Sequence, residues 1–267
     1  MENITTRWAY VPNFITSDMA ELSVLVIGGG GREHAICLGL SKSDSVAEIH
    51  CAPGNAGTAE IATNHDITNV SDLVHLAFQL DVDLVVVGPE APLCDGLADK
   101  LGNMEIPCFG PVAGLARLEG SKLHAKQVMQ ANNVPTADFI IIDSYTDVDH
   151  ALDEYSGNPW VIKRDVLAGG KGVVVTEDRA EAKEFIQQSI NSDGRVLLEA
   201  FLPGNEASML VVMDGSGFVC LPASQDHKRE FEGDKGRNTG GMGAYAPAPV
   251  YTQEVQEKTI ERIVKPM

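Results

Sequence analysis

The 267-residue sequence lacks the marks of a membrane, secreted or zinc-binding protein. Its five cysteines are odd in number and form no C-x-x-C pair, which argues against disulfides or a zinc site and for reduced thiols in the cytoplasm. No apolar run approaches the roughly 18 residues of a membrane span, so we expect no membrane partner. Residues 1–21 contain acids and Pro12 and are interpreted as an N-terminal extension, not a signal peptide.

Basic residues are also scarce. Lysine and arginine together number 20, against 38 aspartates and glutamates, and the formal net charge is −18. A surface of this sign repels phosphate backbones, so we exclude nucleic acid as a partner. Any phosphate-bearing ligand therefore requires a local group of backbone amides and cationic side chains.

The first part of the chain alternates short apolar runs with helical segments. We predict strands at residues 22–27, 46–52, 84–87 and 107–109, and helices at 32–40, 71–80 and 93–101, with Ser71 as an N-cap. Strand and helix in regular alternation are typical of an α/β domain with a doubly wound parallel sheet. We assign this domain to residues 22–120.

The pattern changes after residue 120. We predict helices at 121–131, 148–154 and 180–190, and strands at 139–142, 160–163, 173–176, 196–199 and 207–213. Strands and helices without strict alternation indicate an α+β region. Residues 222–249 are polar and glycine-rich with no clear periodicity, so we predict a functional or disordered loop, followed by a helix that begins near Thr252.

A run of four glycines, Gly28 to Gly31, follows the first predicted strand. It places backbone N–H groups at a helix N-terminus, which suits a phosphate. The dinucleotide fingerprint requires a small residue where this chain has Glu33, so a dinucleotide-dependent oxidoreductase is the weakest of the alternatives. Arg32 and His34 add donors beside the amides, and a phosphate site of another kind is favoured over a simple tight turn.

Two further loops follow predicted strands, PGNAGT with Asn55 and GPEAPL with Glu90. In a doubly wound sheet, loops at the carboxyl ends of the strands converge on one crevice. For each loop taken alone, an ordinary turn is the simpler interpretation. Three unusual loops at such ends together are a stronger indication of a ligand site.

Cations gather in the segment 163–172, KRDVLAGGKG. It is not a P-loop, because Lys171 is followed by Gly172 and no helix begins there. A glycine hairpin with cations can close over a triphosphate, and a solvated hairpin tip is the alternative. Glu199 and Glu206 flank a short linker, where each can accept hydrogen bonds from ribose hydroxyls or an amino group, or simply be solvated.

Together these motifs resemble the phosphoribosylamine–glycine ligase family of de novo purine biosynthesis. The resemblance rests on VLVIGGGGREHAI, APGNAGTA, VVVGPEAPL, the 163–173 segment, SQDHKR and NTGGMGAYAPAP, and covers about residues 22–266. It implies an ATP-grasp architecture, with linker helix and lid at 121–205 and the start of the central domain at 206–267. It also implies ATP and Mg²⁺ (or Mn²⁺) as cofactors, and glycine and 5-phosphoribosylamine as substrates.

The resemblance implies roles for individual residues. The ATP-binding set is Lys122 and Lys163 on the phosphates, Gly169, Gly170, Lys171 and Gly172 in the lid loop, Glu199 and Leu202 at the adenine, and Glu206 at the ribose. The phosphoribosylamine side comprises Gly30, Gly31, Arg32, Glu33, Asn55 and Glu90. The catalytic set is Asp226, His227, Lys228 and Arg229, and the loop that borders glycine contains Asn238, Gly240, Gly241, Met242 and Gly243.

The chain also departs from the family pattern. Arg164 and Val166 replace a small residue and a glycine in the lid segment, and Ala200 replaces an acid. The family continues well past Met267, and its metal-ligand motif has no counterpart in these 267 residues, so we expect no metal ligand here. We therefore expect the chain alone to bind ATP weakly without turnover, with the C-terminal portion in the same or another chain. The alternative is a non-catalytic nucleotide- or phosphoribosyl-binding fragment of that family.

Overall fold

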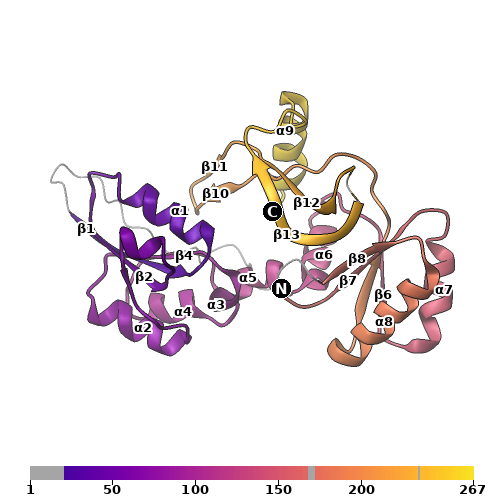
Figure 1. The fold of residues 1–267 in the computed structure, drawn as a ribbon, viewed down its shortest axis with the longest axis horizontal. Coiled ribbons are helices and arrows are strands. Elements are labelled where there is room, and N and C mark those ends of the chain that lie inside the picture. Colours follow the sequence, from indigo (N-terminus) through magenta and orange to yellow (C-terminus); the bar gives the residue numbers. More distant parts are fainter. Residues whose placement is uncertain (1–20, 168–171, 234) are drawn as a thin grey trace. The chain divides into compact units, whose positions relative to one another are not determined.

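The computed structural model describes residues 21–167, 172–233 and 235–267 (Figure 1). The chain divides into two units, one up to Arg117 and one from Leu118, and each is described by itself. In the described part, no helix has the length and apolar character needed to cross a membrane.

The first unit is built on a five-stranded parallel sheet of order β3-β2-β1-β4-β5. The strands are β1 (Leu22–Gly28), β2 (Val46–Pro53), β3 (Thr63–Asn64), β4 (Leu84–Val87) and β5 (Cys108–Phe109). Its helices are α1 (Gly31–Leu40), α2 (Val70–Gln79), α3 (Glu90–Cys94) and α4 (Leu97–Asn103), and α5 (Ala113–Gly120) runs across the division after Arg117. The predicted doubly wound class is confirmed.

Alternate residues of β1 build the two faces of this unit. Val24 and Val26 pack in one buried cluster with Cys37 of α1. Leu25 and Ile27 belong to a second buried cluster, which includes residues of α2 and α4. Both faces of the central strand are therefore covered, which explains why its buried part, residues 24–27, is apolar. Burial also raises the pKa of the Cys37 thiol to about 12, so this thiol is protonated at neutral pH.

Two local predictions in this unit are wrong. Asn69, not Ser71, caps α2, because its Oδ1 accepts hydrogen bonds from the amides of Ser71 and Asp72. The single helix predicted at 93–101 is two helices, α3 and α4, separated at Gly96, which has a left-handed φ of 82°. A side chain is disfavoured in that conformation, so glycine allows the break. Helix α5 was not predicted at all.

The second unit begins with α6 (Lys122–Ala131) and continues into a four-stranded antiparallel sheet of order β6-β9-β7-β8. Its strands are β6 (Phe139–Ile142), β7 (Trp160–Arg164), β8 (Val173–Thr176) and β9 (Val196–Glu199). Helices α7 (Val148–Glu154) and α8 (Arg179–Asp193) lie against this sheet (Figure 1). Ile142, Ile162 and Leu198 pack there with Leu152 and Ile186, all fully buried.

Two β-ribbons and a helix complete the second unit. Strands β10 (Val211–Met213) and β11 (Phe218–Cys220) pair, as do β12 (Gln225–Phe231) and β13 (Lys235–Tyr245), both antiparallel. Helix α9 (Gln253–Thr259) follows and begins near Thr252, as predicted. Thr252 is its N-cap, and the helix ends in a π-helical turn (Ile260–Val264).

The β12–β13 ribbon corrects the prediction of a loop at 222–249. A two-stranded ladder is joined by backbone hydrogen bonds, and none of the ribbon's described residues belongs to a buried apolar cluster, so it leaves no alternating hydrophobic pattern in the sequence. Gly236 and Gly241 have positive φ, and the pairing shifts register twice along β12. The glycines that suggested a loop instead accommodate an irregular ribbon.

Candidate ligand-binding sites

Three loops of the first unit meet at the carboxyl ends of β1, β2 and β4, as the sequence predicts. Asn55 joins two of them. Its Nδ2 donates to the carbonyls of Gly29 and Gly30, both at 3.1 Å, while its Oδ1 accepts from the amides of Gly57 and Thr58 at 2.8 and 3.0 Å. This single side chain therefore fixes the glycine turn against the loop that follows β2.

Glu33 shapes the glycine turn from within. Its side chain is buried, accepts a 2.7 Å hydrogen bond from the Gly30 amide and pairs at 2.8 Å with Arg32 Nε. A Cβ at Gly88 would lie 1.9 Å from Glu33 Oε1, and one at Gly28 would lie 2.6 Å from the same side chain. Glu33 thus fills the place of the small residue in a dinucleotide fingerprint, and its carboxylate is engaged inside the turn.

The outer side of the same turn is open. A Cβ at Gly31, the first residue of α1, would meet nothing within 4 Å. Arg32 and Glu90 lie nearby on the surface, with 3.5 Å between Arg32 Nη1 and Glu90 Oε1. The structure thus brings together all six predicted residues of the phosphoribosylamine side, with Gly31 facing free space at a helix N-terminus.

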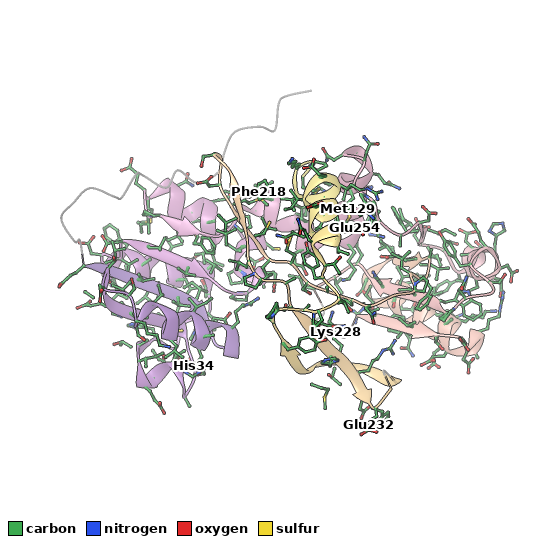
Figure 2. All side chains as sticks on the ribbon, turned by 90° about the horizontal axis from the view of Figure 1, so that it is seen from above. His34, Met129, Phe218, Lys228, Glu232 and Glu254 are labelled. Carbon is green, nitrogen blue, oxygen red and sulfur yellow. The ribbon has the colours of Figure 1, made fainter. Side chains whose placement is uncertain are left out.

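The second unit contains a cavity of about 520 Å³. Its apolar lining includes Leu118, Ala125, Met129, Pro135, Val173 and Leu202, of which Met129 is labelled in Figure 2. Its charged lining is Lys122, Lys126, Lys163, Glu119 and Glu199, three cations against two anions. In a chain of net charge −18, this cavity is a local island of positive charge.

Glu199 lies at the centre of that charged group. Its side chain is only 4% exposed, and its Oε2 lies 3.1 Å from Lys126 Nζ and 2.9 Å from Lys163 Nζ. The interpretation of Glu199 as a solvated surface residue is therefore wrong. Lys126 was missed by the sequence reasoning, although it stands four residues after Lys122 on α6, the spacing that places two side chains on one helix face.

Lys122 contacts the start of the lid segment. Its Nζ donates a 3.1 Å hydrogen bond to the carbonyl of Val166. Burial lowers the pKa of Lys122, against the opposing charges of Asp165 and Glu119. An ammonium held in a partly desolvated cavity gains more from an anionic ligand than one in bulk water does.

Asp165 fixes the start of α6 to the turn after β7. Its buried carboxylate accepts hydrogen bonds of 3.0 Å from Ser121 Oγ and from the Leu123 amide, and pairs at 2.9 Å with Arg195 Nε. The two segments that hold Lys122 and Lys163 are therefore joined by one carboxylate.

The three departures from the family pattern fit this structure. Arg164 pairs with Asp193 through contacts of 2.6 and 2.8 Å, and Val166 is not among the described residues with positive φ. The Ala200 amide donates to the Asp138 carbonyl.

In the predicted lid loop, the Gly172 carbonyl accepts a hydrogen bond from the Arg164 amide. The other predicted lid residues, Gly169, Gly170 and Lys171, lie outside the described residues.

A second charged group lies on the β12–β13 ribbon. Lys228 Nζ lies 2.5 Å from Glu206 Oε1 and 3.5 Å from Asp226 Oδ2 (Figure 2). Burial alone would lower the pKa of Lys228, but its bond to Glu206 and the two carboxylate charges outweigh it, so the pKa is raised. The His227 ring lies 5.6 Å from that of Tyr245, and Arg229 donates to the Gly236 carbonyl.

The predicted glycine-side residues lie on the strand opposite. Gly240, Gly241, Met242 and Gly243 belong to β13, with Met242 exposed, and the Asn238 side chain lies outside the described part. Among the described residues, no hydrogen bond or ion pair links this ribbon to the lysine-lined cavity. In the same part of the chain, no group of three or more histidine, cysteine, aspartate or glutamate side chains is placed to hold a metal ion.

The fold and the cavity define an ATP-grasp protein. Residues 120–267 match the family described as phosphoribosylglycinamide synthetase, ATP-grasp (A) domain, and residues 22–119 match its N domain. The chain therefore belongs to the phosphoribosylglycinamide synthetase family.

Individual relatives agree with this assignment. Phosphoribosylamine–glycine ligases of Mycobacterium tuberculosis and Streptomyces coelicolor are 48% and 47% identical to this chain over 92% of its length. The crystal structure of phosphoribosylamine–glycine ligase from Thermotoga maritima covers 91% of the chain with a TM-score of 0.71 and 34% identity, over 62% of its own length. An N5-carboxyaminoimidazole synthetase from Staphylococcus aureus, complexed with ADP, shares the fold at 16% identity and a TM-score of 0.68, covering 94% of this chain and 66% of its own. The chain spans 60% and 58% of the two curated relatives.

The contact between Gly88 and Glu33 gives a stability prediction. We expect Gly88→Ala to destabilise the first unit by about 1–3 kcal/mol, because the new methyl overlaps a buried carboxylate. Gly31→Ala is the matched control, since its methyl meets open space. Urea unfolding followed by circular dichroism measures both, and equal stability of the two variants would contradict the role given to Glu33.

Proposed function

We propose that this chain binds ATP and takes part in the ligation of glycine to 5-phosphoribosylamine, a step of de novo purine biosynthesis in the cytoplasm. The γ-phosphate of ATP passes to the glycine carboxylate, giving glycyl phosphate and ADP. The amine of phosphoribosylamine then attacks the acyl carbon, phosphate leaves, and glycinamide ribonucleotide results. Such a reaction asks of the protein chiefly the positioning of reactants and the neutralisation of phosphate charge.

The observation that carries this proposal is the lysine-lined cavity. Lys122, Lys126 and Lys163 bring three cations to one cavity of a strongly acidic chain. Its apolar walls suit a planar base, while the ammonium groups suit phosphates. We place the adenine beside Glu199 and the backbone near Leu202, and the phosphates at Lys122 and Lys163 under the lid loop 169–172. Glu206 is assigned to the ribose hydroxyls.

We assign the phosphate of phosphoribosylamine to the glycine turn of the first unit. The support is the open space at Gly31 and the helix N-terminus behind it. Arg32, Asn55 and Glu90 border that space. Glu33 serves this site by shaping the turn, because its carboxylate is already engaged with the Gly30 amide.

We assign glycine and the transferred phosphate to the β12–β13 ribbon. Asp226, His227, Lys228 and Arg229 form its catalytic group, and residues 238–243 border the substrate. Lys228 supplies this group with an ammonium for a developing phosphate charge, and it lies beside Glu206 and Asp226 in the structure.

Mg²⁺ or Mn²⁺ has no fitting ligand set among the described residues. Hard cations prefer several carboxylate oxygens, whereas Glu199 is engaged with two lysines and no acidic cluster is placed for a metal. We propose that the metal ligands lie outside this chain, in sequence equivalent to the remaining length of the relatives. We expect that portion to be the partner in catalysis. We also propose that the chain divides into an N-terminal extension (1–21), a substrate-binding domain (22–120), a linker helix with the lid (121–205) and the start of the central domain (206–267).

Removal of a phosphate-binding lysine tests the nucleotide site. Lys163→Ala is expected to weaken ATP binding by about tenfold to a hundredfold, because a charge-assisted contact contributes about 1.5–3 kcal/mol. Lys183→Ala serves as the control, since this lysine pairs with Asp149 and does not line the cavity. Calorimetry measures both affinities, and an unchanged affinity in Lys163→Ala would refute the assignment.

A β-branched residue at Gly31 tests the first-unit site. We expect Gly31→Val to abolish the thermal protection given by glycinamide ribonucleotide while leaving protection by ATP intact, because the side chain fills the space assigned to the phosphate. Gly39→Val, at the other end of α1 and also in open space, is the matched control. Equal loss of both protections in Gly31→Val would mean misfolding rather than a separate site.

Turnover separates the ligase from a binding fragment. With ATP, Mg²⁺, glycine and fresh phosphoribosylamine, we expect the 267-residue polypeptide to show no glycine-dependent phosphate release above background. Addition of a polypeptide equivalent to the remaining length of the relatives is expected to restore it. Release by the chain alone at about 1 per second or faster would show that carboxylates of this chain hold the metal.

A further inference from the structure

Two lysines share the buried carboxylate of Glu199, but their surroundings differ. The Lys126 side chain is 6% exposed and that of Lys163 is 30% exposed. Both reach the same oxygen, Oε2, from different elements, Lys126 from α6 and Lys163 from β7. Of these two lysines, Lys163 is therefore the one with the side chain more open to a ligand in the cavity.

The hydrogen bonds of Lys126 fix it in place. Its Nζ donates to Thr136 Oγ1 at 2.8 Å and to the Ala137 carbonyl at 2.9 Å, besides its contact with Glu199. An ammonium group has three donors, and these hydrogen bonds use two of them, while Glu199 lies against Nζ as an ion pair. The same Nζ lies 5.5 Å from the centre of the Phe139 ring, within the range of a cation–π contact. Lys126 is thus held by groups of the protein itself.

Lys163 is the opposite case. Among the described residues, Glu199 is the hydrogen-bond partner of its Nζ, at 2.9 Å. Two donors therefore remain for groups in the cavity. If Lys163 left Glu199 for a phosphate and no other cation were present, a buried carboxylate would remain unpaired, which is strongly unfavourable.

We propose that Lys126 is a positioning residue that holds Glu199 neutralised and in place, so that Lys163 can pass from Glu199 to a nucleotide phosphate. This role rests on the proposed nucleotide site and adds an exchange of partners at Lys163. Lys126 itself touches no ligand. Its effect on nucleotide binding therefore operates through the carboxylate of Glu199 and disappears when that charge is removed.

A double-mutant cycle tests this dependence. Calorimetry with ADP compares the wild-type chain with Lys126→Met, Glu199→Gln and the double variant. Methionine keeps an unbranched chain of similar length but has no charge. Lys126→Arg keeps the charge, and Lys183→Met controls for the loss of a lysine elsewhere in the same unit.

We expect Lys126→Met to weaken ADP binding by about tenfold or more in the wild-type background, because Lys163 then stays on Glu199 and its charged hydrogen bond to the phosphate is lost. In the Glu199→Gln background the same change should cost less than about threefold, because the carboxylate that needs neutralising is gone. Lys126→Arg should stay within about threefold of wild type, and Lys183→Met should bind ADP as wild type does.

Several results would overturn the inference. Equal loss in both backgrounds would mean that Lys126 acts independently of Glu199, and no loss in either would mean that it has no role. If Lys126→Met does not fold but the double variant with Glu199→Gln does, folding itself shows that Lys126 is needed because of the Glu199 carboxylate. If neither variant folds, the dependence of Lys126 on Glu199 is refuted. Absence of ADP binding by the wild-type chain would instead refute the proposed function, and this inference with it.

Discussion

The burial of the Glu199 carboxylate is the constraint on which the second unit depends. A carboxylate with so little exposure requires cations within contact distance, and Lys126 and Lys163 supply them from a helix and a strand far apart in sequence. That requirement draws α6 onto the lid sheet, where Asp165 adds a second connection through Ser121 and the Leu123 amide. The cavity and its positive charge follow from the same arrangement.

The first unit uses a buried glutamate in a related way. Glu33 lies inside the glycine turn, binds the Gly30 amide and requires glycine at position 88 because no side chain fits beside it. In each unit, then, an acidic residue within an acidic protein organises donors around itself. The acidic composition disfavours phosphates over the surface as a whole, whereas these two positions concentrate amides and ammonium groups locally.

The sequence predicts an element of the structure where burial of that element leaves a hydrophobic pattern in its residues. The two-residue strand β3 was not predicted, whereas β1 and β4 were predictable because both of their faces are covered, so residues 24–27 of β1 and all of β4 are apolar. The β12–β13 ribbon was not predictable, because none of its described residues belongs to a buried apolar cluster. Lys122, Lys163 and Glu199 could be singled out from motifs, but the burial of Glu199 and the part played by Lys126 depend on contacts between α6, β7 and β9 that no local pattern encodes.

The central claim is that the lysine-lined cavity is the nucleotide site and that Lys163 exchanges Glu199 for a phosphate there. A crystal structure of the chain with ADP tests this most directly. The account predicts ADP in the cavity, with a phosphate oxygen within about 3.2 Å of Lys163 Nζ and with Lys126 still paired to Glu199. ADP bound elsewhere, or bound in the cavity while Lys163 remains on Glu199 without touching phosphate, would contradict it.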